Sequence, residues 1–259
     1  GSSEASLSSK TSKTEVNYDS DEEPPEDAQE QLQWRGDPAE THSDWTLKIV
    51  SGQGDKQTVD TYHVHKFSLA FGARRSEYLE TLFKQEGSDN TTRLELDAVA
   101  AKVVPQVLDY VYKPDDLVIN TQTTAALHYL GQFLGIRRLR WEAKRFWKQD
   151  LSLKNVGTYY ENAYILEDEK ILDAVKDLLV KEIMNVKTTS KIVRVSHCEL
   201  WFKVLELVHA QTGKDKKIKY MSEIVAEFAT KNVDTIDPAA FDKLTAADKL
   251  PVISYKAAA

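Results

Sequence analysis

The assignment of the fold depends on the stretch Tyr62-His-Val-His65-Lys66-Phe-Ser-Leu69-Ala70. Its first residues are the end of a predicted β-hairpin. Upstream of it, apolar and polar residues alternate over residues 45–49, the period of two that is typical of a strand. A turn at residues 51–56 leads into Val59–Val64, which we interpret as the returning strand. We expect this hairpin to open an ordered domain that begins at Ser43.

Amphipathic helices and one further strand follow the hairpin. A helical pattern begins at Ser76, and Arg93–Leu96 alternates as a short strand. From Ala100 the apolar residues recur at the spacing of a single amphipathic helix, which the segment Lys113–Asp116 ends. Two more helices are predicted at residues 123–134 and 138–148. Together these elements predict an α+β domain.

The chain beyond residue 150 shows only helical periodicity. Ser152 is a candidate N-cap of the first helix there, and Asp168 and Glu169 are favourably placed at the N-terminus of the next. Further helices are predicted at residues 200–208 and 221–228, after Asp237-Pro238, and after Thr245. The second part of the chain is therefore expected to be all-helical.

Charge is distributed unevenly along the chain. The net charge is −7 over 259 residues, and residues 1–43 hold eleven acidic side chains but only three basic ones. Residues 1–42 are nearly devoid of aliphatic residues, so we expect a disordered acidic tail, in which Ser20 is either a phosphorylation site or an unmodified residue. The other 216 residues carry 31 bases and 30 acids, a balance that argues against nucleic acid as the main partner.

The composition also indicates where the protein resides. Cys198 is the single cysteine, which excludes an intrachain disulfide and a multi-cysteine metal site. The first thirty residues lack the apolar core of a signal peptide. The longest segment without charged side chains, Leu117–Ile136, is too polar to cross a bilayer. We therefore expect an intracellular protein, cytoplasmic, nuclear or both, with no membrane partner.

No pattern meets the requirements of a catalytic, cofactor or metal site. Gly52-x-Gly54 lies in the hairpin turn and lacks the other residues of a nucleotide-binding loop. His63 and His65 lack a third metal ligand at a matching position, so we interpret them as structural histidines. His197 and Cys198 are adjacent, and adjacent residues rarely orient as a thiol–imidazole pair. The sequence therefore predicts neither an enzyme nor a cofactor.

A basic segment at residues 137–148 holds six bases and one acid, interleaved with aromatic residues. Segments of this kind bind nucleic acid, an anionic membrane or an acidic partner, or are simply solvated helix faces. The helical spacing places Leu139, Phe146 and Trp147, and partly Trp141, toward the packed side. We favour a solvated face, and docking of the acidic tail of this chain is a further alternative.

Four motifs, in the right order and spacing, resemble the BTB/POZ domain. They are the opening strand Ser43–Val50, the stretch Tyr62–Ala70, the helix Ser76-Glu-Tyr78-Leu79-Glu-Thr-Leu82-Phe83 and the helix Val107-Leu108-Asp-Tyr110-Val-Tyr112. The resemblance implies a three-stranded sheet with helices over residues 43–148. Residues 149–259 are similar, through the less specific pattern Leu151-Ser152-x-x-Asn155-Val156, to the helical BACK domain.

The resemblance also assigns roles to individual residues. Asp44 and Lys66 match a charged pair that lines a pocket in some dimeric BTB domains, and His65 matches a buried histidine at the strand–helix corner. Many cullin-binding members carry a hydrophobic-x-Glu motif after the helix that here begins at Ser76. Glu86 is present in that loop, but Lys84 stands at the hydrophobic position, so the motif is not met.

The expected function follows from this resemblance. Chains that combine BTB and BACK domains are usually substrate adaptors of cullin–RING E3 ubiquitin ligases, so we expect a non-catalytic protein–protein interaction protein. The expected partner-binding residues are Lys84, Gln85, Glu86 and Tyr112, with a cullin scaffold as partner and an unidentified protein substrate. The alternatives are a self-associating BTB scaffold and a transcription-linked protein. Many BTB homo-oligomers exchange an N-terminal helix. The corresponding segment here, Leu32–Pro38, is short and is interrupted by Gly36 and Pro38, which argues against this mode of association.

Overall fold

The structure is a computed structural model. It describes residues 32–52, 54–85, 89–113, 115, 117–197, 199–201, 203–204, 207–208, 219–220 and 224. The predicted helices at 221–228, after Asp237-Pro238 and after Thr245 lie outside these residues, apart from Ile224, and so do Ser20 and Cys198. Leu200, Trp201, Val204 and Val208 are buried helical residues, as the spacing predicted.

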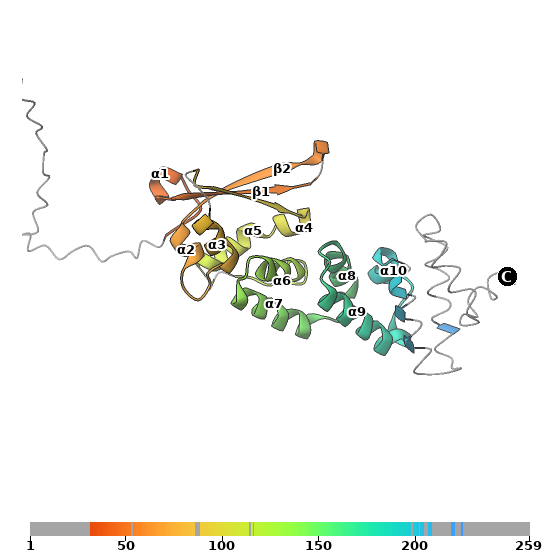
Figure 1. Ribbon diagram of the computed structural model, residues 1–259. Helices are drawn as coiled ribbons and strands as arrows, with labels where there is room; N and C mark the ends of the chain where they lie inside the picture. Colours follow the sequence, from red (N-terminus) through yellow and green to blue (C-terminus); the bar gives the residue numbers. More distant parts are fainter. Residues whose placement is uncertain are drawn as a thin grey trace, which may run out of the picture. The chain divides into compact units, whose positions relative to one another are not determined.

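A three-stranded mixed sheet forms one side of the first part of the chain (Figure 1). The strands β1 (Trp45–Ser51) and β2 (Thr58–Val64) pair antiparallel, with Trp45 opposite Val64, which confirms the predicted hairpin. The strand β3 (Thr91–Leu96) lies on the other side of β1 and runs parallel to it, so the order is β2-β1-β3. This parallel pairing was not predicted.

Helices pack against one face of the sheet and continue beyond it (Figure 1). In chain order the helices of the first part are α1 (Pro38–Thr41), α2 (Lys66–Ala70), α3 (Glu77–Gln85), α4 (Ala98–Ala101), α5 (Val104–Tyr112), α6 (Thr124–Phe133) and α7 (Arg137–Asp150). They are followed by α8 (Val156–Ile165), α9 (Glu169–Glu182) and α10 (Lys191–Val195). An α+β domain followed by helices is the fold class that the sequence predicted.

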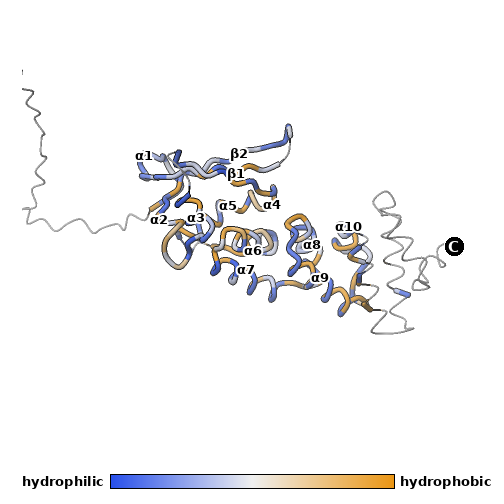
Figure 2. Tube along the Cα trace, in the orientation of Figure 1, coloured by the Kyte–Doolittle hydropathy of each residue, from blue (hydrophilic) through white to orange (hydrophobic). Residues whose placement is uncertain are grey.

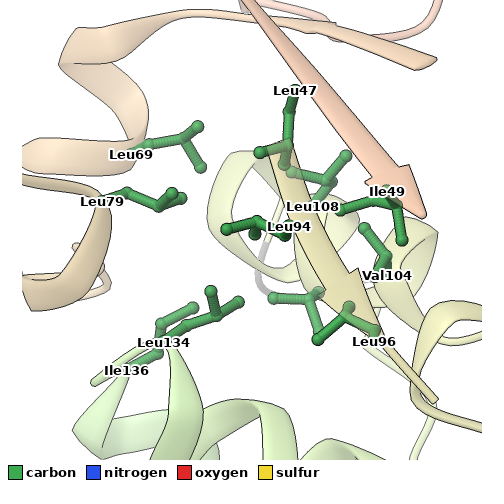
Figure 3. A pocket seen from close by; sticks show the side chains of 11 residues that line it. Leu47, Ile49, Leu69, Leu79, Leu94, Leu96, Val104, Leu108, Leu134 and Ile136 are labelled. Atoms are coloured by element: carbon green, nitrogen blue, oxygen red, sulfur yellow. The ribbon is translucent and has the colours of Figure 1, made fainter. Parts of the chain in front are cut away.

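The core under the sheet is built from aliphatic side chains. Leu47 and Ile49 of β1 and Leu94 and Leu96 of β3 face helix residues such as Leu108 (Figure 3). Among them lies a cavity of about 20 Å³, lined only by aliphatic side chains. A space of this size accommodates one water molecule, but a water needs polar partners that the lining does not supply. The cavity is therefore a packing defect of the core and not a ligand site.

The structure corrects the predicted helix that begins at Ala100. Two helices, α4 and α5, stand in its place, and Pro105 lies in the first turn of the second. Proline has no backbone N–H and its ring clashes with the preceding turn, so a continuous helix cannot pass through it. Asp97 caps α4 by accepting a hydrogen bond from the N–H of Val99 at 2.8 Å.

The predicted cap at Ser152 is also wrong, whereas Asp168 lies at the N-terminus of α9, as expected. The helix α8 begins at Val156, and Asn155 turns back so that its Oδ1 accepts the N–H of Ser152 at 2.8 Å. Ser152 therefore belongs to the turn before the helix. Asp168 caps α9 by accepting the N–H groups of Lys170 and Ile171.

Ordered structure begins before Ser43, the predicted start. Pro38–Thr41 is a helical turn, capped by Asp37, whose Oδ1 accepts the N–H of Ala39 at 2.9 Å. Proline at the first helical position has a backbone angle that already suits a helix. Residues 1–31 of the predicted tail lie outside the described residues.

A polar junction joins the helices α6 and α7 to the helices that follow them. Oδ2 of Asp150, at the end of α7, accepts hydrogen bonds from Thr121 Oγ1 and Tyr159 Oη, both at 2.8 Å, and from Asn155 Nδ2 at 2.9 Å. Tyr159 is fully buried, and this burial, together with Asp150, raises the pKa of its hydroxyl. Because all these partners are satisfied, the junction fixes the direction in which α8 leaves α7.

A buried histidine–aspartate contact strengthens the same junction. Nδ1 of His128 on α6 lies 2.5 Å from Oδ2 of Asp168 at the start of α9, and the two side chains are 1% and 8% exposed. Burial alone would raise the pKa of Asp168, but the hydrogen bond and charge of His128 and the N–H groups of the α9 cap lower it overall. The carboxylate form of Asp168 is therefore the form that the fold stabilises.

We predict that Asp168 makes the free energy of unfolding decrease as the pH falls into the acidic range. Because its folded-state pKa is depressed, its contribution is complete above the unfolded-state value of about 4 and is lost as pH falls through the folded-state pKa. Asp168→Asn should lower the free energy of unfolding near neutral pH by about 1.5–3 kcal/mol, the cost of losing a buried hydrogen bond to a charged group.

The measurement is urea unfolding of the wild type and the variant at several pH values between about 3 and 7, the range over which carboxylates titrate. Asp177→Asn, a change at an exposed site of the same helix, is the matched control and should alter stability little. Equal stability of Asp168→Asn and wild type near neutral pH would contradict the assignment.

Candidate partner-binding site

The corner between β2 and α2 is held by His65, which is 6% exposed. Its backbone N–H donates to Tyr112 Oη on α5 at 2.8 Å, and its Nδ1 lies 2.9 Å from the same oxygen. Its Nε2 lies 2.6 Å from the carbonyl oxygen of Thr41, which can only accept. The geometry therefore fits a neutral imidazole that donates from Nε2 and accepts the Tyr112 hydroxyl proton at Nδ1.

This arrangement confirms the interpretation of His65 as a buried structural histidine. Both ring nitrogens of His65 already have hydrogen-bond partners within the chain. Among the residues that the structure describes, no cluster of three or more His, Cys, Asp or Glu side chains could hold a metal ion. Burial raises the pKa of Tyr112, which keeps its hydroxyl protonated and able to donate.

Asp44 and Lys66 meet at the same corner, but through the backbone. Oδ1 of Asp44 accepts the N–H of Lys66 at 2.8 Å. The ammonium of Lys66 lies 3.6 Å from the ring centroid of Trp45 and 5.8 Å from that of Phe83, where it makes cation–π contacts. Within the described part of the chain, no ion pair joins the two side chains. The aspartate orders the start of α2, and the lysine covers an aromatic pair.

The end of α3 lies against this corner through Phe83. The rings of Phe83 and Trp45 are 5.1 Å apart in an edge-to-face arrangement. Lys84 and Gln85 follow Phe83 and are exposed, and Nζ of Lys84 lies 2.8 Å from Glu80 Oε1. Glu86 lies outside the described residues. Asp44, Tyr112 and the end of α3 therefore lie around the segment His65-Lys66. We call this group of residues the His65 corner.

An N-terminal clamp next to this corner was missed from the sequence. Trp34 Nε1 donates to Asp109 Oδ1 on α5 at 2.9 Å, and Arg35 reaches both oxygens of the same carboxylate, at 3.2 and 2.8 Å. The ring of Trp34 also meets that of Tyr62 on β2 at 5.6 Å. The only available signal was a tryptophan followed by an arginine within an otherwise polar segment.

Two exposed aromatic side chains lie on α2 and at the residue that follows it. Phe67 and Phe71 are each 68% exposed, and their rings are stacked 5.2 Å apart. Water-exposed phenylalanines that cover only one another retain much of the apolar area that a partner could bury. The His65 corner is therefore rigid inside and presents apolar and basic groups outside.

A comparison with protein families identifies this fold. The model of the BTB/POZ domain matches residues 39–151. Residues 39–151 are therefore a BTB/POZ domain, a class of domain that mediates protein–protein interaction and oligomerisation. No curated protein sequence matches the chain. Within the described ranges, every helix falls short of the length or apolarity needed to span a bilayer.

We predict that Tyr112 supports the His65 corner rather than contacting a partner through its hydroxyl. Tyr112→Phe leaves the buried N–H of His65 without its acceptor, so the free energy of unfolding should fall by about 1–3 kcal/mol. Tyr78→Phe is the matched control, because Tyr78 is 36% exposed. Urea denaturation followed by circular dichroism measures both. Equal stability of Tyr112→Phe and wild type would show that the hydroxyl does not hold the corner.

Proposed function

We propose that this protein is a non-catalytic adaptor that recruits a substrate protein to a cullin–RING E3 ubiquitin ligase. The BTB/POZ match supports the coarser statement that the domain mediates protein interactions. The observation that carries the finer proposal is the His65 corner. Asp44, Lys66 and the exposed end of α3 surround one rigid histidine, so a partner meets a preformed surface.

The cullin contact is proposed for the outer side of this corner. Lys84 and Gln85 are exposed at the end of α3, and Glu86 follows them in the sequence. Tyr112 contributes from beneath, because its hydroxyl fixes His65 and therefore the position of α2. The departure at Lys84 from the hydrophobic-x-Glu pattern replaces an apolar contact with a basic one, which suits an acidic side chain on the cullin.

The helices after the BTB/POZ domain are proposed to be a BACK-like module that carries the substrate. The junction at Asp150 and the contact between His128 and Asp168 support this role, because they hold α8 and α9 in a fixed direction from α7. We propose residues 43–148 and 149–259 as the two domains, and an intracellular site of action. The transcription-linked alternative has no support from a described residue beyond the basic helix α7.

A self-associating scaffold is the second candidate, and one specific observation favours it. Phe67 on α2 and Phe71 directly after it are stacked and exposed, a surface that a second copy could cover. Trp34 and Arg35 already bind Asp109 of their own chain, so this association would use α2 and not an exchange of the N-terminal segment. The same experiment distinguishes the two candidates.

The test is a titration of the full chain with a cullin N-terminal domain, with the mass of every species read by light scattering. We predict binding at micromolar dissociation constant or tighter, about −8 kcal/mol. The charge-exchanged variant Lys84→Glu/Glu86→Lys keeps the net charge and should bind at least about tenfold more weakly, a loss of about 1.4 kcal/mol.

The control is Phe67→Ser/Phe71→Ser, which changes α2 and leaves the end of α3 intact. This variant should keep its affinity for the cullin, and any oligomer of the wild type should dissociate. Absence of cullin binding together with a stable oligomer that this variant abolishes would replace the adaptor by the scaffold. Cullin binding unaffected by the charge exchange would refute the proposed contact at the end of α3.

A further inference from the structure

The outward face of α7 carries one exposed tryptophan. Leu139, Ala143 and Trp147 are buried on the opposite face, where α7 packs along α6. Trp141, which was expected to pack only partly, is 57% exposed. It follows Leu139 by two residues, which places it about 200° around the helix from that buried position. Figure 2 shows hydrophilic residues along α7, in contrast to the hydrophobic residues of α6.

Two of the basic residues of α7 are neutralised by neighbours. Arg137 NH2 lies 2.8 Å from Glu77 Oε1 on α3, and Arg138 Nε lies 3.0 Å from Glu142 Oε1 one turn along α7. Exposed pairs of this kind add little stability, but they satisfy the charges that they join. These two arginines therefore already have carboxylate partners within the chain.

Three further cations surround Trp141 without such partners. Among the described residues, Lys144, Arg145 and Lys148 have no carboxylate within ion-pair distance. The guanidinium carbon of Arg145 lies 4.9 Å from the ring centroid of Trp141. Lys144 and Lys148 lie one turn apart on the helix, and like charges at this spacing repel each other. Trp141, Lys144, Arg145 and Lys148 therefore form a local concentration of positive charge beside an exposed aromatic ring.

We propose that this face of α7, formed by Trp141, Lys144, Arg145 and Lys148, docks an acidic peptide segment of a protein partner. Carboxylates of the peptide pair with the three cations, and an apolar side chain of the peptide covers the indole. The indole carries most of the affinity, because a tryptophan buried among charged contacts is a typical hot spot. The surface lies on a different helix from the His65 corner, so it does not depend on the proposed cullin contact.

A membrane surface fits this helix less well. A helix that lies in a bilayer interface buries its apolar face among the lipids. The apolar face of α7 is already occupied, because Leu139 and Ala143 are fully buried and Trp147 is 5% exposed. Only Trp141 remains to enter the lipid, which is too little apolar area for insertion.

Nucleic acid also fits less well than an acidic peptide. Sequence-independent binding draws on many phosphate contacts, about 6–10 in well-studied cases, and on a long-range positive field. Here three cations lie within five residues of one helix, a rise of about 6 Å. Outside residues 1–43 the chain carries 31 bases against 30 acids, so it produces no such field. A short acidic peptide matches both the size and the local charge of the surface.

The test uses a fluorescent peptide with the sequence of residues 15–30, which holds eight acids and no base. Fluorescence anisotropy measures its binding to the full chain. We expect a micromolar dissociation constant that weakens as salt rises from about 50 mM to about 500 mM. Trp141→Ala should weaken binding at least about tenfold, and Lys144→Glu/Arg145→Glu/Lys148→Glu should abolish it.

A matched control separates the surface from net charge. Lys48→Glu/Lys56→Glu/Lys102→Glu changes the charge by the same amount at three exposed sites on other elements. This control should change the affinity less than about twofold, because distant exposed charges are screened. Equal loss of binding in the control and in the α7 variant would overturn the proposal.

A second chain variant removes competition from the acidic segment of the protein itself. It replaces the eight acids of residues 15–30 with the corresponding amides. Peptide binding to this variant alone, lost again when the α7 changes are added, would show that the acidic segment of the chain itself occupies α7, and would overturn a partner peptide as the occupant. Failure of the peptide to bind either chain overturns the proposal. Tighter binding of a single-stranded DNA oligonucleotide or of phosphatidylserine vesicles than of the peptide overturns it as well.

Discussion

His65 stands where four segments of the BTB/POZ domain meet, and each of its polar groups has a partner there. Tyr112 brings α5, the carbonyl of Thr41 brings the N-terminal segment, and the residue itself joins β2 to α2. Because the site is buried, a missing partner would leave an unsatisfied polar group at full desolvation cost. This constraint fixes the position of α2. The start of α2 in turn positions Lys66, whose N–H binds Asp44 and whose ammonium lies over Trp45.

Buried polar groups also have hydrogen-bond partners farther along the chain. Asp150 collects three side-chain donors at the end of α7, and Asp168 receives His128 while it caps α9. Buried polar groups thus determine the angles between elements, and the aliphatic core supplies most of the driving force for folding. Outside these contacts lie the surfaces at the His65 corner and on α7 that we propose for partners.

Periodicity in the sequence predicted the hairpin, β3 and most helices because it depends only on neighbouring residues. The break before Pro105 was also readable, since proline disfavours the interior of a continuous helix and is tolerated in its first turn. The parallel pairing of β3 and the clamp of Trp34 on Asp109, 75 residues away, depend on long-range packing that local patterns do not carry. The site residues were named by resemblance, and their grouping around His65 required the three-dimensional structure.

The most direct test of the His65 corner is hydrogen exchange at the backbone amide of His65, followed by NMR. We predict that this amide exchanges only through global unfolding, so that its protection free energy equals the free energy of unfolding from urea denaturation. Exchange within minutes, as for the amide of an exposed loop, would show that the N–H of His65 is not held by Tyr112. The corner would then be a flexible junction and not the fixed centre of the domain.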